Sequence, residues 1–595
     1  MEHAVNVFAI GTWKPEVSTS TALSSKSLTE LRSTPMAFYS RAHICHCLSR
    51  LATLRIHSAV TISGNRRNTG HQFVDGVLSL AQGLLDLGVR SGHVVAISAL
   101  NSDRYLECFL AVAFVGGVVA PLNYRWSFEE ARFAMEMVKP VMLITDSSCS
   151  YWYPKLENDH LPSLRWHVFM DSFLTLTTEM LKKPALKSLS FNYAWAPEGA
   201  VLICFTSGTT GRPKGVTISH SALIIQSLAK IAIVGYDEDD VYLHTAPLCH
   251  IGGLSSALTM LMVGGCHIFI PKFDAKLALE AIKQHHVTSL ITVPAIMADL
   301  VSIIRIHEMV LSVMLPGLES FVRMKMTWKV TESVKKILNG GGGLSNGLIE
   351  DAIKFFPRAK ILSAYGMTET CSSLTFMTLY DPTCASSRQA LQEFVEIKSS
   401  SFHLPEGVCV GKPAPHVELK ICFDSSDHVG RILTRGPHIM LRYWDQIPSR
   451  PSDSPDEGWL DTGDIGSIDD YGNIWLIGRT NNQIKSGGEN VYPEEVETVL
   501  SQHPGVTGSV VVGLPDVRLT EMVVACIRIK DNWQWADNSP VHPTEKKELV
   551  LSSETLRHHC REKNLNWEAI PTYINWKIEK IPSSERSFVP PALLA

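Results

Sequence analysis

The sequence predicts an α/β fold of more than one domain, in which helices cover largely parallel sheets. From about residue 36 to 300, a helical pattern at 73–87 alternates with short apolar runs at 94–99, 141–145 and 267–270. This alternation is typical of βαβ units. A chain of 595 residues with 45% hydrophobic and 19% charged residues can bury more than one core.

The ends of the predicted fold are marked by changes in composition. Residues 1–35 are rich in Ser and Thr and lack apolar periodicity, which indicates either an unstructured extension or an organelle transit segment. After Gly478-Arg479 the chain becomes polar, and a helix-start signal follows at Tyr492-Pro493-Glu494-Glu495. We therefore expect a domain boundary after residue 479.

Charge and apolar runs exclude some classes of partner. The net charge of −5 is too small and too mixed to indicate a nucleic acid or a charged membrane surface. The apolar stretch 108–122 is interrupted by Gly116-Gly117 and is shorter than the ~20 residues that cross a bilayer. We expect a buried helix that runs into a strand there, and no transmembrane segment. A second apolar stretch, 309–326, has no clear period and is predicted to be an insertion between two elements.

Thirteen cysteines are scattered without paired spacing, which favours reduced thiols over a disulfide framework. The dense group is His43, Cys45, His46 and Cys47. A zinc site usually draws its ligands from two separated pairs, and no second pair follows at a useful distance. An amphipathic first helix is therefore the preferred interpretation of this group.

The loop 206–215, Thr-Ser-Gly-Thr-Thr-Gly-Arg-Pro-Lys-Gly, is predicted to bind phosphates and follows an apolar strand at 201–205. Glycines let backbone N–H groups approach an anion, hydroxyls add donors, and Lys214 adds positive charge. The spacing differs from a Walker A loop, because Lys214 stands three residues after Gly211 and precedes Gly215. A flexible linker is the alternative, but linkers rarely lie between two apolar runs.

Three later segments suggest a nucleotide site. Four glycines at 340–343 let a flat ring lie against bare backbone. The run Tyr365-Gly366-Met367-Thr368-Glu369 offers an aromatic face, a hydroxyl and a carboxylate that suits Mg²⁺. Asp464 at a predicted turn could accept two ribose hydroxyls with Arg479 in support. Each segment taken singly could be a plain loop or turn.

Together, in this order and at these separations, the motifs resemble those of the acyl-adenylate-forming superfamily, the AMP-dependent synthetases and ligases, over about residues 40–575. The resemblance implies a large N-terminal region of mixed α/β subdomains, 36–479, and a small mobile C-terminal α+β lid, 480–595. It implies ATP, Mg²⁺ and coenzyme A as cofactors and a small carboxylic acid as substrate, joined through an acyl-adenylate. The catalytic residues that it implies are Thr206, Lys214, His250 and Glu369, with Glu369 also as the metal ligand. The binding residues that it implies are Ser207, Gly208, Thr209, Thr210, Gly211, Gly341, Gly342, Gly343, Tyr365, Gly366, Thr368, Asp464, Arg479, Lys485, Gly487 and Gly488.

Within the superfamily, the stretch 485–493 is similar to the segment that faces the active site during thioester formation, which favours a CoA ligase over a luciferase. Segments 120–127, 337–345 and 363–370 are most similar to the plant ligases that act on 2-succinylbenzoate. Ligases of cinnamate-type or fatty acids are the alternatives. A chloroplast or peroxisome location is implied by the resemblance and not by a terminal signal.

The C-terminal sequence departs from the family pattern. Relatives carry a lysine near the end that reaches the acyl phosphate during adenylation, and counting from Pro582 places Phe588 at that position. Losing one transition-state cation commonly costs ~10² to 10³ in rate. Asn481, where many relatives carry Asp, is a milder change because both residues favour turns. Two hypotheses follow: a CoA ligase with weakened adenylation, or a nucleotide- or CoA-binding protein that no longer catalyses.

Overall fold

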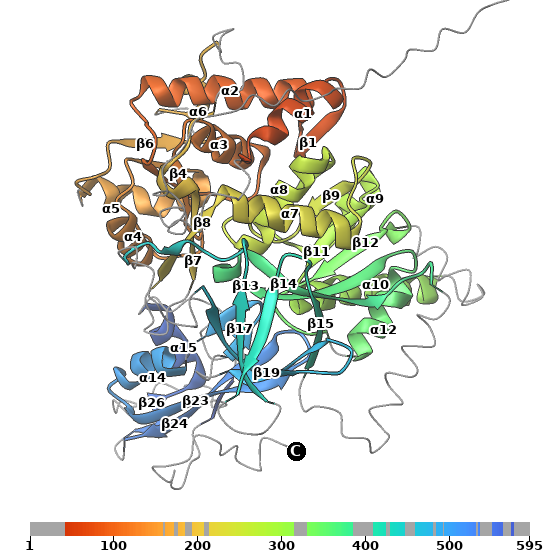
Figure 1. Ribbon diagram of the computed structural model, residues 1–595. Helices are drawn as coiled ribbons and strands as arrows, with labels where there is room; N and C mark the ends of the chain where they lie inside the picture. Colours follow the sequence, from red (N-terminus) through yellow and green to blue (C-terminus); the bar gives the residue numbers. More distant parts are fainter. Residues whose placement is uncertain are drawn as a thin grey trace, which may run out of the picture. The chain divides into compact units, whose positions relative to one another are not determined.

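The computed structural model describes residues 42–158, 161–171, 176–184, 193–206, 213–314, 330–344, 346–384, 408–423, 429–446, 458–479, 484–491, 493–530, 533–535, 550–562 and 573–575. The predicted extension at 1–35 and the unusual C-terminal sequence around Phe588 lie outside these residues, as does Asn481. In the described part, the mixed α/β architecture predicted from the sequence is confirmed (Figure 1).

A seven-stranded sheet contains the strand that leads into the phosphate loop. Its order is β18-β8-β7-β4-β3-β5-β6, with parallel pairing from β7 to β6 and antiparallel pairing of β7 with β8 and of β8 with β18. The strands are β3 (Val94–Ser98), β4 (Val118–Pro121), β5 (Met142–Thr145), β6 (Trp166–Phe169), β7 (Ala200–Thr206), β8 (Lys214–Ser219) and β18 (Arg442–Tyr443). The accompanying helices are α1 (His46–Leu54), α2 (Gly70–Asp86), α3 (Asp103–Phe114), α4 (Phe128–Val138), α5 (Tyr153–Asn158) and α6 (Thr178–Leu181).

A longer path of thirteen strands runs β16-β17-β19-β20-β15-β14-β13-β12-β11-β9-β10-β1-β2 and is parallel from β1 to β13. The strands are β1 (Ala59–Ser63), β2 (Arg66–Thr69), β9 (Val241–His244), β10 (Cys266–Phe269), β11 (Ser289–Thr292), β12 (Lys336–Asn339), β13 (Lys360–Met367), β14 (Ser372–Tyr380), β15 (Val408–Pro413), β16 (Glu418–Cys422), β17 (Gly430–Arg435), β19 (Leu460–Ile468) and β20 (Ile474–Arg479). The helices along this path are α7 (His220–Val234), α8 (Ile251–Val263), α9 (Ala275–His285), α10 (Pro294–Met314) and α12 (Asn346–Phe355).

A smaller sheet of five strands forms from residues after 483, with the order β22-β21-β24-β23 and β27 paired to β24. Its elements are β21 (Ile484–Ser486), β22 (Glu489–Val491), α14 (Pro493–Ser501), β23 (Val506–Asp516), β24 (Thr520–Ile529), α15 (Ser553–Glu562) and β27 (Tyr573–Asn575), beside the short pair β25 (Gln534–Trp535) and β26 (Val550–Leu551). Helix α14 begins at Pro493, as the sequence predicts. The boundary after residue 479 stays a prediction.

Most elements predicted from periodicity are present, with small shifts in their ends. The pattern at 73–87 corresponds to α2, which starts at Gly70 because Thr69 and Gln72 form a capping box. The stretch 108–122 is the buried helix α3 followed by β4, and the group at His43–Cys47 leads into helix α1. The sequence predicted an insertion between two elements at 309–326. The prediction is wrong for residues 309–314, which continue helix α10. Residues 315–326 lie outside the described residues.

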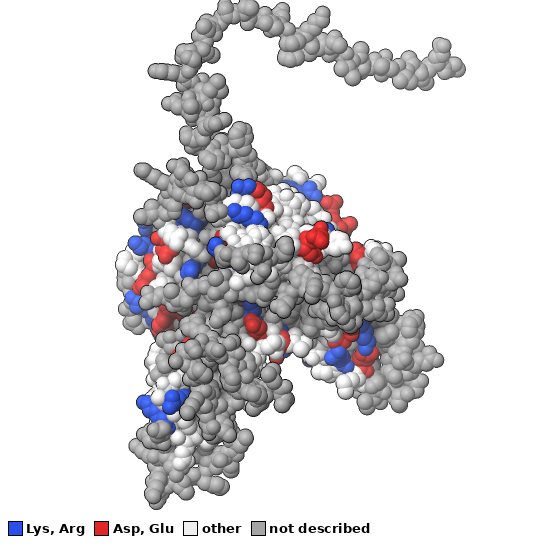
Figure 2. Space-filling view, turned by 60° about the horizontal axis from the view of Figure 1, so that its bottom comes forward, with Lys and Arg blue, Asp and Glu red and all other residues white. Residues whose placement is uncertain are grey.

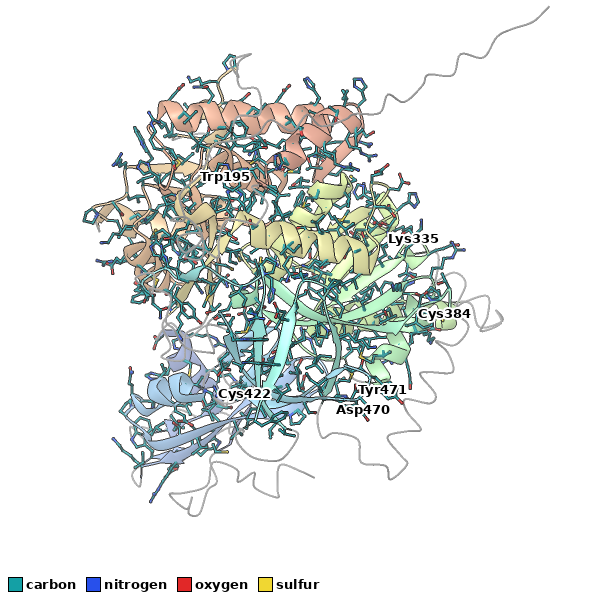
Figure 3. All side chains as sticks on the ribbon, viewed as in Figure 1. Trp195, Lys335, Cys384, Cys422, Asp470 and Tyr471 are labelled. Atoms are coloured by element: carbon teal, nitrogen blue, oxygen red, sulfur yellow. The ribbon has the colours of Figure 1, made fainter. Side chains whose placement is uncertain are left out.

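The cysteines form no disulfide, and the charged side chains do not gather by sign on the face that Figure 2 shows. All thirteen cysteines lie in the described part and are free. Figure 3 marks Cys384, which follows β14, and Cys422, the last residue of β16. Basic and acidic side chains are interspersed on the described surface that Figure 2 shows. No helix among the described residues combines the length and apolarity needed to cross a membrane.

Candidate functional site

A cavity of about 810 Å³ lies where parallel strands of the long sheet end. Residues at the carboxyl ends of β9, β11, β12 and β13 line it, including Thr245, Thr292, Asn339 and Gly366. This is the edge at which open α/β sheets usually bind ligands. Of the predicted site residues, those that line the cavity are Thr206, Lys214, His250, Gly341, Gly366, Thr368, Glu369, Lys485, Gly487 and Gly488.

The predicted phosphate loop connects two antiparallel strands whose ends open into the cavity. Thr206, the last residue of β7, pairs with Lys214, the first residue of β8. Both residues line the cavity, so the hairpin brings a hydroxyl and an ammonium group to one wall. The loop residues Ser207, Gly208, Thr209, Thr210 and Gly211 lie outside the described residues.

A tyrosine that the sequence analysis did not single out links Lys214 to Glu369. The Lys214 ammonium lies 5.3 Å from the ring centroid of Tyr443, and the Tyr443 hydroxyl donates a hydrogen bond of 2.9 Å to Glu369 Oε1. Tyr443 reaches this position because the two-residue strand β18 pairs with β8. Glu369 is 8% exposed and lines the cavity from a short 3₁₀ helix, Thr368–Thr370.

A hydrogen bond joins Tyr365 to Asp464, 99 residues later in the chain, and neither residue lines the cavity. The buried Tyr365 hydroxyl donates to Asp464 Oδ2 at 2.5 Å, and the Lys485 ammonium lies 6.0 Å from the tyrosine ring centroid. Asp464 lies within strand β19 and not at the predicted turn. The irregular backbone is at Gly463, whose φ is +72°. Arg479 pairs with Asp464 through the backbone, and its side chain lies outside the described residues.

The glycine run after β12 is only partly exposed to the cavity. Gly341, with φ of +70°, lines the cavity, whereas Gly342 and Gly343 are not among the described residues that do so. A Cβ at Gly342 would lie 2.4 Å from the Thr520 hydroxyl oxygen. The run is therefore packed in part against the smaller sheet, which differs from the predicted bare surface for a ring.

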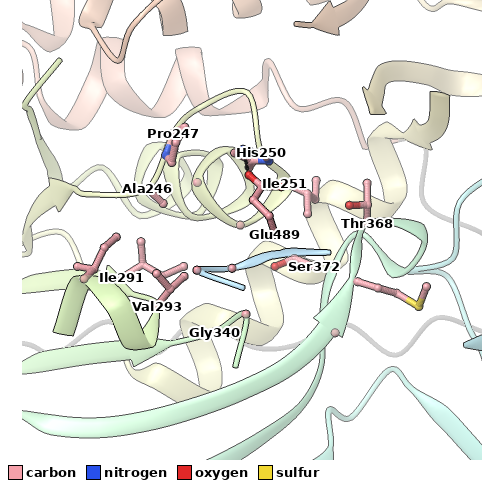
Figure 4. Close-up of a pocket in the computed structure, with 18 of the residues that line it drawn as sticks. Ala246, Pro247, His250, Ile251, Ile291, Val293, Gly340, Thr368, Ser372 and Glu489 are labelled. Carbon is pink, nitrogen blue, oxygen red and sulfur yellow. Dashed lines mark ion pairs between the residues drawn. The ribbon is translucent and has the colours of Figure 1, made fainter. Parts of the chain in front are cut away.

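His250 closes another side of the cavity together with a carboxylate from the smaller sheet. His250 Nε2 lies 3.1 Å from Glu489 Oε1, and Figure 4 shows this ion pair above the cavity. Burial would raise the pKa of Glu489, but the neighbouring His250 and Arg125 outweigh it and hold the pKa below its ordinary value. Asn101 braces the loop before His250 by accepting from Leu248 N–H at 2.8 Å.

The turn between β21 and β22 is held in the cavity by contacts across the two parts of the chain. Gly487 N–H donates to the Leu519 carbonyl at 2.9 Å. Arg518 makes a two-pronged ion pair with Asp299 of α10, at 2.8 and 2.9 Å. Sequence reasoning selected the stretch 485–493 but missed Glu489, Arg125, Tyr443 and Arg518 as individual site residues, because pairing of distant segments brings them to the cavity.

Comparisons with known proteins give consistent matches over most of the chain. A family model described as AMP-binding enzyme matches residues 51–444, and one described as AMP-binding enzyme C-terminal domain matches residues 495–586. The chain is 55% identical to 2-succinylbenzoate–CoA ligase, chloroplastic/peroxisomal, of Arabidopsis thaliana over 91% of this chain and 94% of that protein.

Two solved structures of o-succinylbenzoate CoA synthetase from Bacillus subtilis are also similar. One, a double mutant bound to a product analogue, is 25% identical with a TM-score of 0.66, covering 90% of this chain and 95% of that chain. The other, in complex with ATP and a magnesium ion, is 25% identical with a TM-score of 0.58, covering 90% of this chain and 96% of that chain.

Proposed function

Because the chain belongs to the AMP-binding enzyme family, we propose that it is an ATP-dependent acid–CoA ligase that joins 2-succinylbenzoate to coenzyme A. The observation that carries the proposal is that the hairpin β7–β8 and the turn between β21 and β22 open into one cavity. One segment supplies groups suited to phosphates, and the other supplies a polar turn beside the acid pocket. A ligase that works in two steps needs both.

In the first step, a carboxylate oxygen of the acid attacks the α-phosphorus of ATP, and pyrophosphate leaves. Both reactants are anions, so positive charge must offset their repulsion. We assign Lys214 and Thr206, with Ser207 to Gly211, to the phosphates. Asp464 and Arg479 are assigned to the ribose, and Tyr365, Gly366 and Gly341 to the adenine.

The donor groups near Glu369 fit a magnesium ion. One carboxylate oxygen accepts from Tyr443, and the carboxylate keeps further lone pairs for a cation. Mg²⁺ is usually held by one or two carboxylates together with substrate phosphates and water. Bound there, Mg²⁺ would offset negative charge on the phosphates. Glu369 and Thr368 are the residues that we assign to this region.

In the second step, the coenzyme A thiolate attacks the activated carbonyl and AMP leaves. We assign Lys485, Gly487 and Gly488 to this step, because their turn lines the cavity next to His250. His250 stands beside the acid pocket, where Ile291 and Val293 provide an apolar side (Figure 4). We place the domain boundary after residue 479, so that the smaller domain carries this turn.

The Arabidopsis relative is named chloroplastic/peroxisomal, which supports a location in the chloroplast, the peroxisome or both. A role in phylloquinone synthesis goes with the proposed substrate. The second hypothesis, a nucleotide- or CoA-binding protein that no longer catalyses, is motivated by Phe588 at the position of the family's lysine. Both hypotheses predict binding of ATP and Mg²⁺. They differ in turnover.

Hydroxylamine trapping of the acyl-adenylate, with a panel of acids that starts with 2-succinylbenzoate, tests the proposal. We expect ATP-dependent hydroxamate and, with coenzyme A, thioester from 2-succinylbenzoate in preference to cinnamate-type and fatty acids. Turnover of another acid alone would reassign the substrate. ATP binding without hydroxamate from any acid would support the impaired protein.

A further inference from the structure

Helix α7 carries a lysine that is fully buried beside the cavity. Lys230 has no exposed surface, and its ammonium donates to the hydroxyl oxygens of Ser255 at 2.6 Å, Ser372 at 3.2 Å and Ser256 at 3.3 Å. Burying an ammonium group is unfavourable unless an anion or a full set of acceptors compensates it. Three hydroxyls satisfy its protons but leave its charge unbalanced.

No carboxylate among the described residues acts on Lys230, whose pKa is affected only by burial and by Cys371. The nearby Cys371 does not supply the missing charge, because burial raises the pKa of its thiol to about 12. Burial lowers the pKa of Lys230 to about 8, so most of the ammonium is still protonated at pH 7. The fold thus keeps a positive charge in its interior without an acidic partner.

One of the three serines connects this charge to the cavity. Ser372 lines the cavity near Thr368, as Figure 4 shows. Its φ of +108° lies in a region that L-residues rarely adopt. Gln226, four residues before Lys230 on α7, braces the same turn by donating to the carbonyls of Thr370 and Ser373 at 3.2 and 2.6 Å. Helix α7 therefore fixes both the strained turn and the charge behind it.

The proposed substrate offers the missing anion. 2-Succinylbenzoate carries two carboxylates, of which one is activated and the other stays ionised. We propose that Lys230, acting through the Ser372 hydroxyl, positions the carboxylate that is not activated, and so makes the site selective for dicarboxylic acids. Ser372 accepts from Lys230, and its hydroxyl also lies 3.4 Å from the Ser373 hydroxyl, a bond in which either oxygen can donate. When Ser373 donates in that bond or the bond is released, the Ser372 proton can turn to the carboxylate. This inference rests on the proposed function.

The selectivity follows from the cost of leaving buried polar groups without partners. A monocarboxylic analogue would fill the same apolar space but leave the Lys230 charge unbalanced, and the Ser372 proton would have only the long contact of 3.4 Å to Ser373 among the described side chains. Sites built to bond a substrate group discriminate strongly against analogues that lack it. Lys230 does not touch the substrate in this arrangement, so it is a positioning residue.

The test compares 2-succinylbenzoate with 4-oxo-4-phenylbutanoate and 2-butyrylbenzoate, each of which lacks one carboxylate. For the unmodified protein, we expect kcat/KM to be at least about 100-fold higher for 2-succinylbenzoate than for either analogue. In Lys230→Met, this ratio should fall below about 10, mainly through a higher KM for 2-succinylbenzoate, while kcat/KM for the reacting analogue changes less than about threefold.

Two further variants separate this role from a structural one. Ser372→Ala should also lower the ratio, whereas Ser227→Ala, which removes another buried hydroxyl of α7, should preserve it. If Lys230→Met does not fold, the inference is tested by two other results: the kcat/KM ratio of the unmodified protein, and the fall of that ratio in Ser372→Ala. Equal use of all three acids, or an equal fall for all three in Lys230→Met, would overturn the inference. Failure to activate any acid would instead overturn the proposed function.

Discussion

The ion pair between Arg518 and Asp299 is expected to favour thioester formation, because it holds the turn between β21 and β22 in the cavity. Its two N–O distances are 2.8 and 2.9 Å, and the side chains are 53% and 33% exposed. Exposed pairs contribute about 0.2–1 kcal/mol, and the two-pronged geometry places this one near the upper end. Removing ~1 kcal/mol shifts an equilibrium between two arrangements about fivefold.

Arg518→Ala should therefore slow thioester formation about three- to fivefold and leave adenylate formation unchanged or slightly faster. The first step can be followed by hydroxylamine trapping, and the second by supplying synthetic acyl-adenylate with coenzyme A. Arg561→Ala is a matched control, because Arg561 is 54% exposed and pairs with Glu554 at 3.0 Å within α15. The reasoning is refuted if both steps fall equally, or if Arg561→Ala has the same effect.

Three other perturbations test the site and its support. Glu369→Gln should lower adenylate formation by ~10² to 10³ and raise the Mg²⁺ concentration required, as measured by pyrophosphate release; an unchanged Mg²⁺ dependence would remove Glu369 from the metal site. Gly253→Ala places a Cβ 2.2 Å from a backbone oxygen and should cost about 1–3 kcal/mol in urea unfolding, whereas Gly252→Ala, with 3.9 Å of space, should be tolerated. Burial lowers the pKa of His43 to about 4 and that of His267 to about 3, so the unfolded chain takes up protons first as the pH falls below 6.5. The stability that the two neutral histidines contribute is complete above pH 6.5. It is lost as the pH falls toward their folded pKa values, by up to about 2 kcal/mol for each histidine at pH 5. Equal urea midpoints at pH 7 and pH 5 would contradict this.

Local patterns predicted the elements well where one segment determines its own structure. Helix α2 follows from its apolar period and the Thr69–Gln72 capping box, and α3 with β4 follows from an apolar run broken by glycines. The end of α10 at 309–314 did not follow, because the apolar run there has no clear helical period. Met309 and Val310, at its start, are exposed. Strand β18 was also missed, since two residues carry no periodic signal.

Site residues within short motifs were likewise predicted, whereas residues that distant segments bring to the cavity were not. Thr206, Lys214 and Glu369 lie in short motifs whose chemistry is visible in the sequence. Tyr443 and Arg125 reach the cavity through contacts with segments far away in the chain, which one sequence does not specify. The contact between Tyr365 and Asp464 was likewise not expected, although both residues were selected.

The two hairpins at the cavity differ in how they can change its charge. Lys214 is fixed in β8 of the seven-stranded sheet, whereas Lys485 and Glu489 belong to β21 and β22 of the small one, and Arg518 lies between its strands β23 and β24. If the smaller domain rotates between the two steps, these three residues leave the cavity together, so two positive charges and one negative charge are removed. His250 then loses its carboxylate partner. Such a rotation would therefore lower the positive charge around the cavity by one, while Lys214 would stay on the wall that β8 forms.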